Sequence, residues 1–125
     1  ATLATELGML LPMVRIKDKL SLQKFEYEIQ IFGNRVAGNF LRPDKVLAID
    51  SGMTTGRIEG EETREPAFGK RAYWIDSAIR QQAEIYGYRV VESGAVLATH
   101  LQEVARKHAE ELLTRDVTKQ LIDQL

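Results

Sequence analysis

The chain has 125 residues, 44% of them hydrophobic, which suffices for one domain or for two small lobes in one chain. Its 17 basic and 18 acidic side chains leave a formal net charge of -1, which gives no electrostatic support for binding nucleic acid or an anionic membrane. Cysteine is absent, and this excludes disulfides, cysteine-ligated zinc and a cysteine nucleophile.

A short helix and a strand are predicted at the start of the chain. Leu3 and Leu7 lie on one helical face, and Gly8 is a typical C-terminal stop. Residues 13–17 alternate apolar and charged side chains, which is the period of a half-buried strand.

A hairpin is predicted next. Residues 25–32 alternate apolar and polar side chains, so one face of the strand should be buried. That face consists of Phe25, Tyr27, Ile29 and Ile31. Gly33 and Asn34 then predict a two-residue turn into a return strand over residues 35–41. Gly38 within that strand indicates a bulge or a close backbone approach.

The middle of the chain predicts a buried strand and then a long loop. Residues 45–49 are apolar enough for a short buried strand. Residues 50–65 are polar and interrupted by Gly52, Gly56 and Gly60. These glycines lack the lysine and the spacing of a phosphate-binding loop, so a mobile loop is expected.

A strand, a helix and a second strand are predicted after this loop. Residues 72–75 form the first strand, and Asp76 is a natural N-cap for the helix that follows. Gly87 ends this helix, and residues 88–91 form the second strand.

The longest predicted helix begins at Ser93, which is a favourable N-cap. Its buried stripe is expected to contain Leu97, Leu101, Val104, Ala105, His108 and Leu112. The opposite, solvated face is expected to contain Thr99, Glu103, Arg106 and Glu110. Thr114 or Asp116 is expected to cap a separate last helix.

These elements predict a mixed α+β fold with one lobe inserted into another. A small three-stranded sheet needs the long helix to cover its apolar face, so residues 1–43 and 93–113 form a first subdomain. Residues 44–92 form a β-α-β second subdomain inserted into it. Apolar patterns run to both ends, so we expect the chain to be part of a larger protein.

No catalytic or metal site is predicted. His100 and His108 are eight residues apart, and neither has a second ligand at a metal-binding spacing. His108 is expected to be a packed, hydrogen-bonded core histidine. Glu59, Glu61 and Glu62 are expected in an exposed loop, where nothing would desolvate a carboxylate. We therefore expect no enzyme activity and no cofactor, and a protein that binds other proteins.

The order of short segments along the whole chain resembles the cytoplasmic domain of the FHIPEP family, the export-gate membrane protein of bacterial type III secretion systems. The segments resemble the flagellar members more than the injectisome members. They are residues 8–12, 14–18, 26–27, 43–45, 47–49, 65–69, 73–75, 87–88, 90–91, 98–101 and 119–123.

The resemblance implies a membrane channel before this chain, then a cytoplasmic region of four subdomains that assembles as a nonameric ring. It makes residues 114–125 the opening helix of a truncated third subdomain. It places the whole protein in the bacterial inner membrane and this segment, as a soluble part, at the cytoplasmic face. In the flagellar members, the groove between the first two subdomains binds complexes of export substrates with their chaperones. The implied partners are therefore those complexes and other components of the export apparatus.

Three residues match the family's binding motifs. Glu65 and Phe68 belong to an acidic-Pro-Ala-Phe-Gly motif, and Thr99 belongs to an Ala-Thr-His motif. Relatives can have aspartate where this chain has Glu65, and the extra methylene moves the charge by about 1.5 Å. Trp74 lies in a predicted strand and is expected in the core.

Two alternatives remain open at this point. Phe68 and Thr99 can instead contact a neighbouring subunit in a ring of export-gate chains. More distantly, the chain can be a small-molecule-binding module in which the loop of residues 50–64 acts as a lid.

Overall fold

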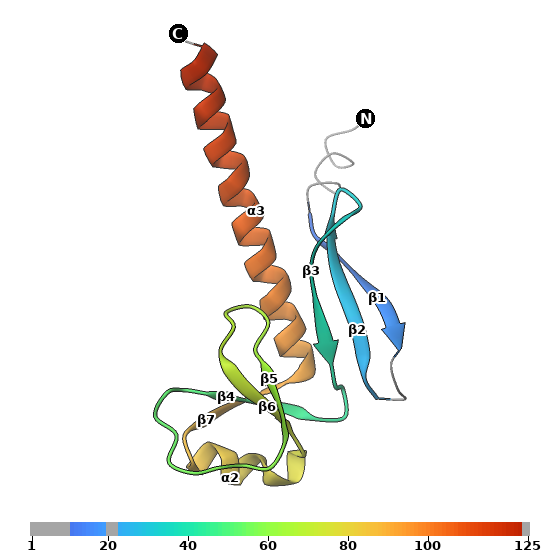
Figure 1. The fold of residues 1–125 in the computed structure, drawn as a ribbon, viewed down its shortest axis with the longest axis vertical. Coiled ribbons are helices and arrows are strands. Elements are labelled where there is room, and N and C mark those ends of the chain that lie inside the picture. The colour runs from blue at the N-terminus through green and yellow to red at the C-terminus, as the bar shows by residue number, and fades with distance from the viewer. Residues whose placement is uncertain (1–10, 20–22, 124–125) are drawn as a thin grey trace.

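The structure is a computed structural model that describes residues 11–19 and 23–123, and within them the side chains of all but Asp18 and residues 115–123. Two antiparallel sheets lie beside one long helix, which confirms the predicted α+β class (Figure 1). The first sheet contains β1 (Met13–Lys19), β2 (Phe25–Ile31) and β3 (Asn34–Leu41). The second contains β4 (Val46–Asp50), β5 (Glu61–Arg64), β6 (Arg71–Ile75) and β7 (Tyr88–Glu92). The helical elements are the 3-10 turn η1 (Ser77–Ile79), α2 (Arg80–Ile85) and α3 (Ser93–Asp123).

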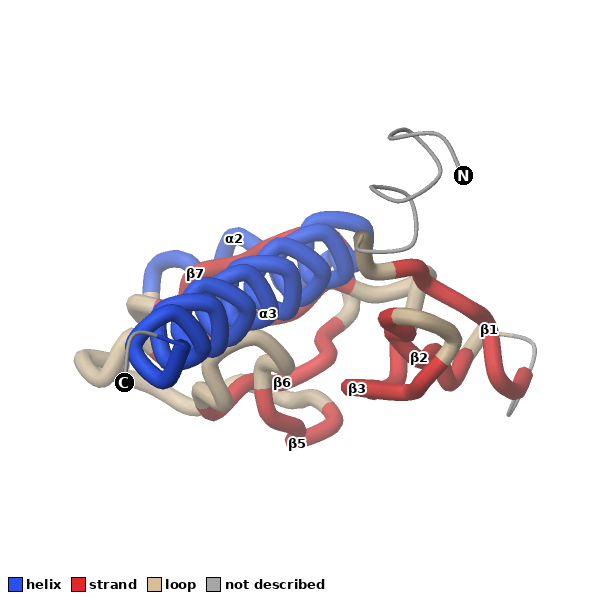
Figure 2. Tube along the Cα trace, turned by 90° about the horizontal axis from the view of Figure 1, so that it is seen from above, coloured by secondary structure: helices blue, strands red, loops and turns tan. Residues whose placement is uncertain are grey.

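Strand β3 lies nearest to α3 and β1 lies farthest from it (Figures 1 and 2). The apolar side chains of Val14 and Ile16 on β1 are consequently 36% and 57% exposed, although they pair with the buried Ile29 and Tyr27.

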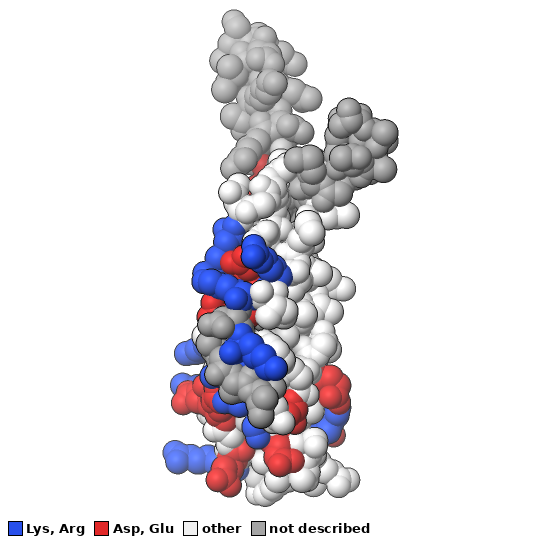
Figure 3. Space-filling view, turned by 90° about the vertical axis from the view of Figure 1, so that its right-hand side faces the viewer, with Lys and Arg blue, Asp and Glu red and all other residues white. Residues whose placement is uncertain are grey.

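Figure 3 shows basic and acidic side chains interspersed on the side of the molecule that it presents. The helix predicted for residues 1–7 lies outside the described residues.

The hairpin of β2 and β3 has the predicted buried face, but its turn lies one residue earlier than predicted. Ile31 pairs with Asn34, so the turn residues are Phe32 and Gly33, with φ of 55° and 76°. Positive φ at both positions matches the twist of the flanking strands. The prediction of a Gly33-Asn34 turn is wrong because Asn34 already belongs to β3.

A bulge and a close backbone contact occur together in β3. The register shifts so that Val36 has no partner on β2. A Cβ atom at Gly38 would lie 3.0 Å from the carbonyl oxygen of Tyr27 and 2.6 Å from the Arg35 guanidinium. The prediction that Gly38 marks such a place is confirmed.

The second sheet has the strand order β5-β6-β4-β7, and β5 is a strand that was not predicted. Residues 61–64 were expected in a loose loop, but they pair with β6 as an edge strand. Glu61 forms ion pairs with Lys24 at 3.0 Å and Arg42 at 2.6 Å. Burial alone would raise the pKa of Glu61, but these two cations outweigh it and hold the pKa below its usual value. Glu61 is therefore a paired carboxylate and not a loop residue.

The helix between β6 and β7 begins and ends as predicted. The Asp76 carboxylate accepts a hydrogen bond of 2.9 Å from the Ala78 N–H at the start of η1. Gly87 adopts a φ of 96°, and its N–H donates to the Glu84 carbonyl after α2 ends. Glycine accepts this left-handed conformation without steric cost.

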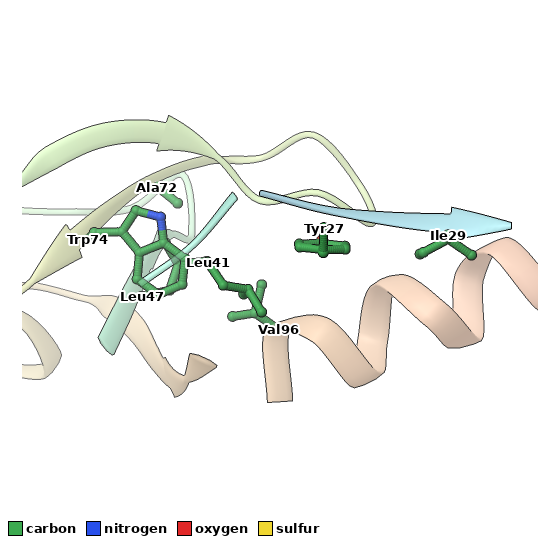
Figure 4. Close-up of a cluster of buried hydrophobic side chains, with 7 residues drawn as sticks. All are labelled: Tyr27, Ile29, Leu41, Leu47, Ala72, Trp74 and Val96. Carbon is green, nitrogen blue, oxygen red and sulfur yellow. The ribbon is translucent and has the colours of Figure 1, made fainter. Parts of the chain in front are cut away.

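One buried cluster draws on both sheets and α3 (Figure 4). Its members are Tyr27, Ile29 and Leu41 of the first sheet, Leu47, Ala72 and Trp74 of the second, and Val96 of α3. Trp74 is 4% exposed, which confirms its predicted place in the core. A separate cluster lies between the other face of the second sheet and α2. The two lobes thus share a core, and the subdomain boundaries at residues 43 and 93 stay a prediction.

The face that α3 buries is rotated from the predicted stripe. Its buried side chains are those of Val96, His100 and Glu103. Leu97, Leu101 and Val104 are half-buried beside this line and pack against the shared core. Glu103 was expected in water, but it is only 8% exposed and pairs with Arg106.

The helix α3 continues unbroken through residue 114 to Asp123. The Thr114 hydroxyl donates to the Glu110 carbonyl inside the helix, so the predicted N-cap at Thr114 or Asp116 is wrong. No helix within the described residues has both the length and the apolar content needed to cross a membrane.

Candidate docking groove

A groove of about 290 Å³ lies where one face of the second sheet meets the first turns of α3. All three residues predicted to bind a partner, Glu65, Phe68 and Thr99, line this groove. Its apolar lining includes Ile49, Val91 and Val96, and its charged lining includes Asp50, Lys70 and Arg89. The structure therefore brings together residues that are 34 positions apart in the sequence.

The loop of residues 65–70, which joins β5 to β6, is held by a dense set of backbone hydrogen bonds. The Glu65 N–H donates to the Lys70 carbonyl at 2.7 Å, and the Gly69 N–H donates to the Glu65 carbonyl at 2.8 Å. Pro66 fixes one backbone dihedral, and Gly69 adopts a φ of 73° that closes the turn. This loop is a tight hairpin connection closed by hydrogen bonds between its own residues.

Phe68 projects from this loop and is 62% exposed. An aromatic ring of this size is usually buried, because burying it contributes several kcal/mol. Thr99 approaches from α3, where its side chain is half-buried at the groove wall. The solvated position predicted for Thr99 is therefore only partly reached.

Glu65 is buried, with 4% of its surface exposed. One carboxylate oxygen accepts the Ala67 N–H at 3.0 Å and the other accepts the Phe68 N–H at 2.7 Å. Charge-assisted bonds of this kind are about twice as strong as neutral ones. The carboxylate thus holds the backbone that carries Phe68.

The loop between β4 and β5 is anchored at several points. The Thr55 N–H donates to the Tyr86 carbonyl at 2.9 Å, and the Ser51 hydroxyl donates to the Gly87 carbonyl at 2.8 Å. The Tyr88 hydroxyl donates to the Gly56 carbonyl at 3.1 Å. These bonds hold the loop against α2 and β7, which does not favour the lid of a small-molecule site.

Comparison with known proteins identifies the family. The FHIPEP family model matches residues 1–125. The chain belongs to the FHIPEP family. It is 46% identical over 123 residues to the flagellar biosynthesis protein FlhA of Bacillus subtilis (strain 168), which is 98% of this chain and 18% of that protein. It is 40% identical over 123 residues to the protein of that name from Helicobacter pylori (strain J99), which is 98% of this chain and 17% of that protein. It is 43% identical over 122 residues to the protein of that name from Escherichia coli (strain K12), which is 98% of this chain and 18% of that protein.

The predicted FHIPEP membership is thus confirmed, and all three of these relatives carry a flagellar name. The chain spans less than a fifth of the length of each relative. The relatives' names do not by themselves assign a binding role to Glu65, Phe68 or Thr99.

A buried polar pair of the FHIPEP chain lies close to Glu65 and was not predicted. The Tyr27 hydroxyl and His100 Nδ1 are 2.7 Å apart, and the two rings meet edge to face. Burial lowers the pKa of His100 and raises that of Tyr27, while the Glu65 charge raises both. The sequence signal for this pair is the position of His100 on α3, one helical turn after the buried Val96.

The unfolding free energy of the FHIPEP chain is expected to fall as the pH drops below about 6.5. His100 has a lowered pKa in the folded state, so the unfolded chain binds the extra proton first and gains stability relative to the fold. The contribution of the uncharged His100 ring to the unfolding free energy is complete above pH 6.5 and is lost as the pH falls through the folded pKa of His100. Urea unfolding between pH 8 and 5 measures this slope.

A His100→Gln variant is the control for this pH dependence, because glutamine can accept a hydrogen bond from Tyr27 but does not titrate. The slope between pH 6.5 and 5 is expected to flatten in this variant. Glu61 and Glu103 have lowered pKa values and contribute only at more acidic pH. An unchanged slope would assign the effect to other groups.

His108 lies at a second cavity, of about 250 Å³, on the other side of the loop of residues 65–70. Its ring meets Phe32 edge to face at 6.3 Å, as expected for a packed histidine. Among the described residues, however, its buried Nε2 atom has no hydrogen-bond partner. The prediction that His108 is hydrogen-bonded is therefore not met at this atom.

Proposed function

We propose that this segment is a docking platform of a type III protein export gate. It binds export substrates and chaperone–substrate complexes and delivers them toward the membrane channel. The observation that carries the proposal is the exposed Phe68, presented by a hydrogen-bonded loop at a groove that Thr99 also lines. The FHIPEP membership supports the export-gate setting at the cytoplasmic face of the bacterial inner membrane.

The physical case rests on preorganisation. Binding energy in protein interfaces concentrates in a few aromatic or arginine side chains that fill pockets on the partner. Ordering a flexible loop on binding costs free energy, and the hydrogen bonds made by Glu65 and Gly69 avoid that cost here. Phe68 can therefore anchor a partner without reorganisation, and Glu65 contributes by holding it in place.

Phe68→Ala is expected to weaken binding of a chaperone–substrate complex by about 30-fold, since truncated anchor residues cost about 2 kcal/mol or more. The measurement is isothermal titration of the longest natural chain that contains these residues with a flagellar chaperone loaded with its export substrate. Ile85 is 76% exposed on α2, outside the groove, so Ile85→Ala is the matched control and should bind normally.

Equal affinities of the Phe68→Ala variant and the unmodified chain would overturn the docking proposal. Sedimentation of the same variant tests the ring-contact alternative. If Phe68→Ala weakens self-association and leaves chaperone binding unchanged, the groove is a subunit contact and not a docking site.

A further inference from the structure

Two basic side chains of the groove lie on the face of the second sheet that borders α3. Arg89 pairs with Ile49 across β7 and β4, and paired residues share a face of the sheet. Lys70 precedes β6 and lies two residues before the buried Ala72, so it falls on the same face. Both line the groove together with Phe68, and both are exposed.

The negative charges of the groove are already used within the chain. The Glu65 carboxylate accepts the N–H groups of Ala67 and Phe68, and the Asp50 carboxylate accepts the Gly52 N–H at 2.8 Å. Neither Lys70 nor Arg89 has an ion-pair partner among the described side chains. The groove thus offers an apolar lining and two cations that form no ion pair with a described carboxylate of the chain.

We propose that the occupant of this groove is a protein segment that presents an apolar side chain flanked by carboxylates. The apolar side chain packs against Phe68 and the half-buried Val91, and the carboxylates pair with Lys70 and Arg89. This inference rests on the proposed docking function and adds the chemistry by which the partner is selected. Guanidinium and carboxylate groups match in geometry, since arginine can donate two parallel hydrogen bonds to one carboxylate.

A polyanion such as nucleic acid fits the groove less well. A phosphate backbone carries one negative charge per nucleotide, and the groove offers only the two cations Lys70 and Arg89. The near-neutral chain also lacks the basic field that concentrates polyanions. An acidic and apolar protein segment satisfies the two cations with fewer charges and also covers Phe68.

The test uses the double variant Lys70→Gln and Arg89→Gln in the longest natural chain, titrated with the same substrate-loaded flagellar chaperone. Exposed ion pairs contribute modestly, so the affinity should fall about fivefold at 50 mM salt and the salt dependence should become flatter. At 1 M salt the double variant and the unmodified chain should bind alike. Arg71→Gln is the matched control, because Arg71 adjoins Lys70 on the opposite face and pairs with Glu62.

Three outcomes separate this inference from the docking proposal. If Phe68→Ala loses binding but the double variant matches the unmodified chain at both salt concentrations, docking stands and the acidic partner is wrong. If Phe68→Ala binds normally, both proposals fall. If a 20-nucleotide single-stranded DNA displaces the chaperone complex, the cations serve a polyanion and the inference is overturned. Circular dichroism of each variant verifies its fold.

Discussion

Trp74→Ala is expected to lower the free energy of unfolding by about 3 to 5 kcal/mol, the largest single effect we predict. The indole is 4% exposed and lies in the buried cluster that joins both sheets to α3. Removing it leaves a cavity that the packed neighbours fill only partly. Because Trp74 is the only tryptophan, urea unfolding should be followed by far-ultraviolet circular dichroism.

Phe68→Ala is the control for this experiment, because it truncates an aromatic ring only six residues away. Phe68 is 62% exposed, so its loss should change the unfolding free energy by less than about 0.5 kcal/mol. Comparable destabilisation by the two substitutions would show that Phe68 supports the fold and does not serve as an anchor.

Glu65→Ala is expected to destabilise the chain by about 2 to 3 kcal/mol and to weaken chaperone binding as much as Phe68→Ala does. The substitution leaves the N–H groups of Ala67 and Phe68 without their carboxylate, and each lost partner costs about 1 kcal/mol or more. The loop then samples other conformations and no longer presents the ring. Unfolding and titration on the same preparation give the two values.

Two milder variants of this residue define the cause. Glu65→Asp should keep most of the stability, because aspartate readily accepts N–H groups two and three residues ahead. Glu65→Gln should lose about half as much as Glu65→Ala, since only one oxygen remains to accept. If Glu65→Asp binds as weakly as Glu65→Ala with a normal stability, the carboxylate touches the partner directly and is not only a support.

Most of the fold was predictable from the alternation of apolar and polar residues in the strands and from the capping residues at the helix ends. The buried face of β2 follows from the apolar residues at every second position, and Asp76 and Gly87 bound the α2 region as their chemistry requires. The first three strands have no neighbouring helix in the sequence to cover their apolar face, which predicted that a distant helix packs on them. The helix α3 packs there.

The sequence did not predict the strand β5 or the buried face of α3, because both depend on contacts between distant segments. All four residues of β5 are polar, and the strand is defined by its bonds to β6 and by the ion pairs of Glu61. The face of α3 is set by the junction of two sheets, where Glu103 is buried beside Arg106. A charged residue at helical spacing gives no sign of such burial.

The resemblance named Glu65, Phe68 and Thr99 as partner-binding residues, and that role stays a prediction. Phe68 and Thr99 were expected at a partner surface, and the structure places them on one groove. The internal bonds of Glu65 depend on the closure of its own turn, which the letters of the motif do not reveal. The sequence alone does not show that Lys70 and Arg89 lie on one face of the second sheet, because this depends on the strand register.

The junction between β7 and α3 gives the long helix a mechanical property. β7 ends at Glu92 and α3 begins at Ser93, so no connecting residue can absorb a rotation between them. With 31 residues, α3 is about 46 Å long. A tilt of about 10° at its base would sweep its far end through about 8 Å. A small tilt of the second sheet beside the groove would therefore displace Asp123, at the far end of the helix, by a much larger distance.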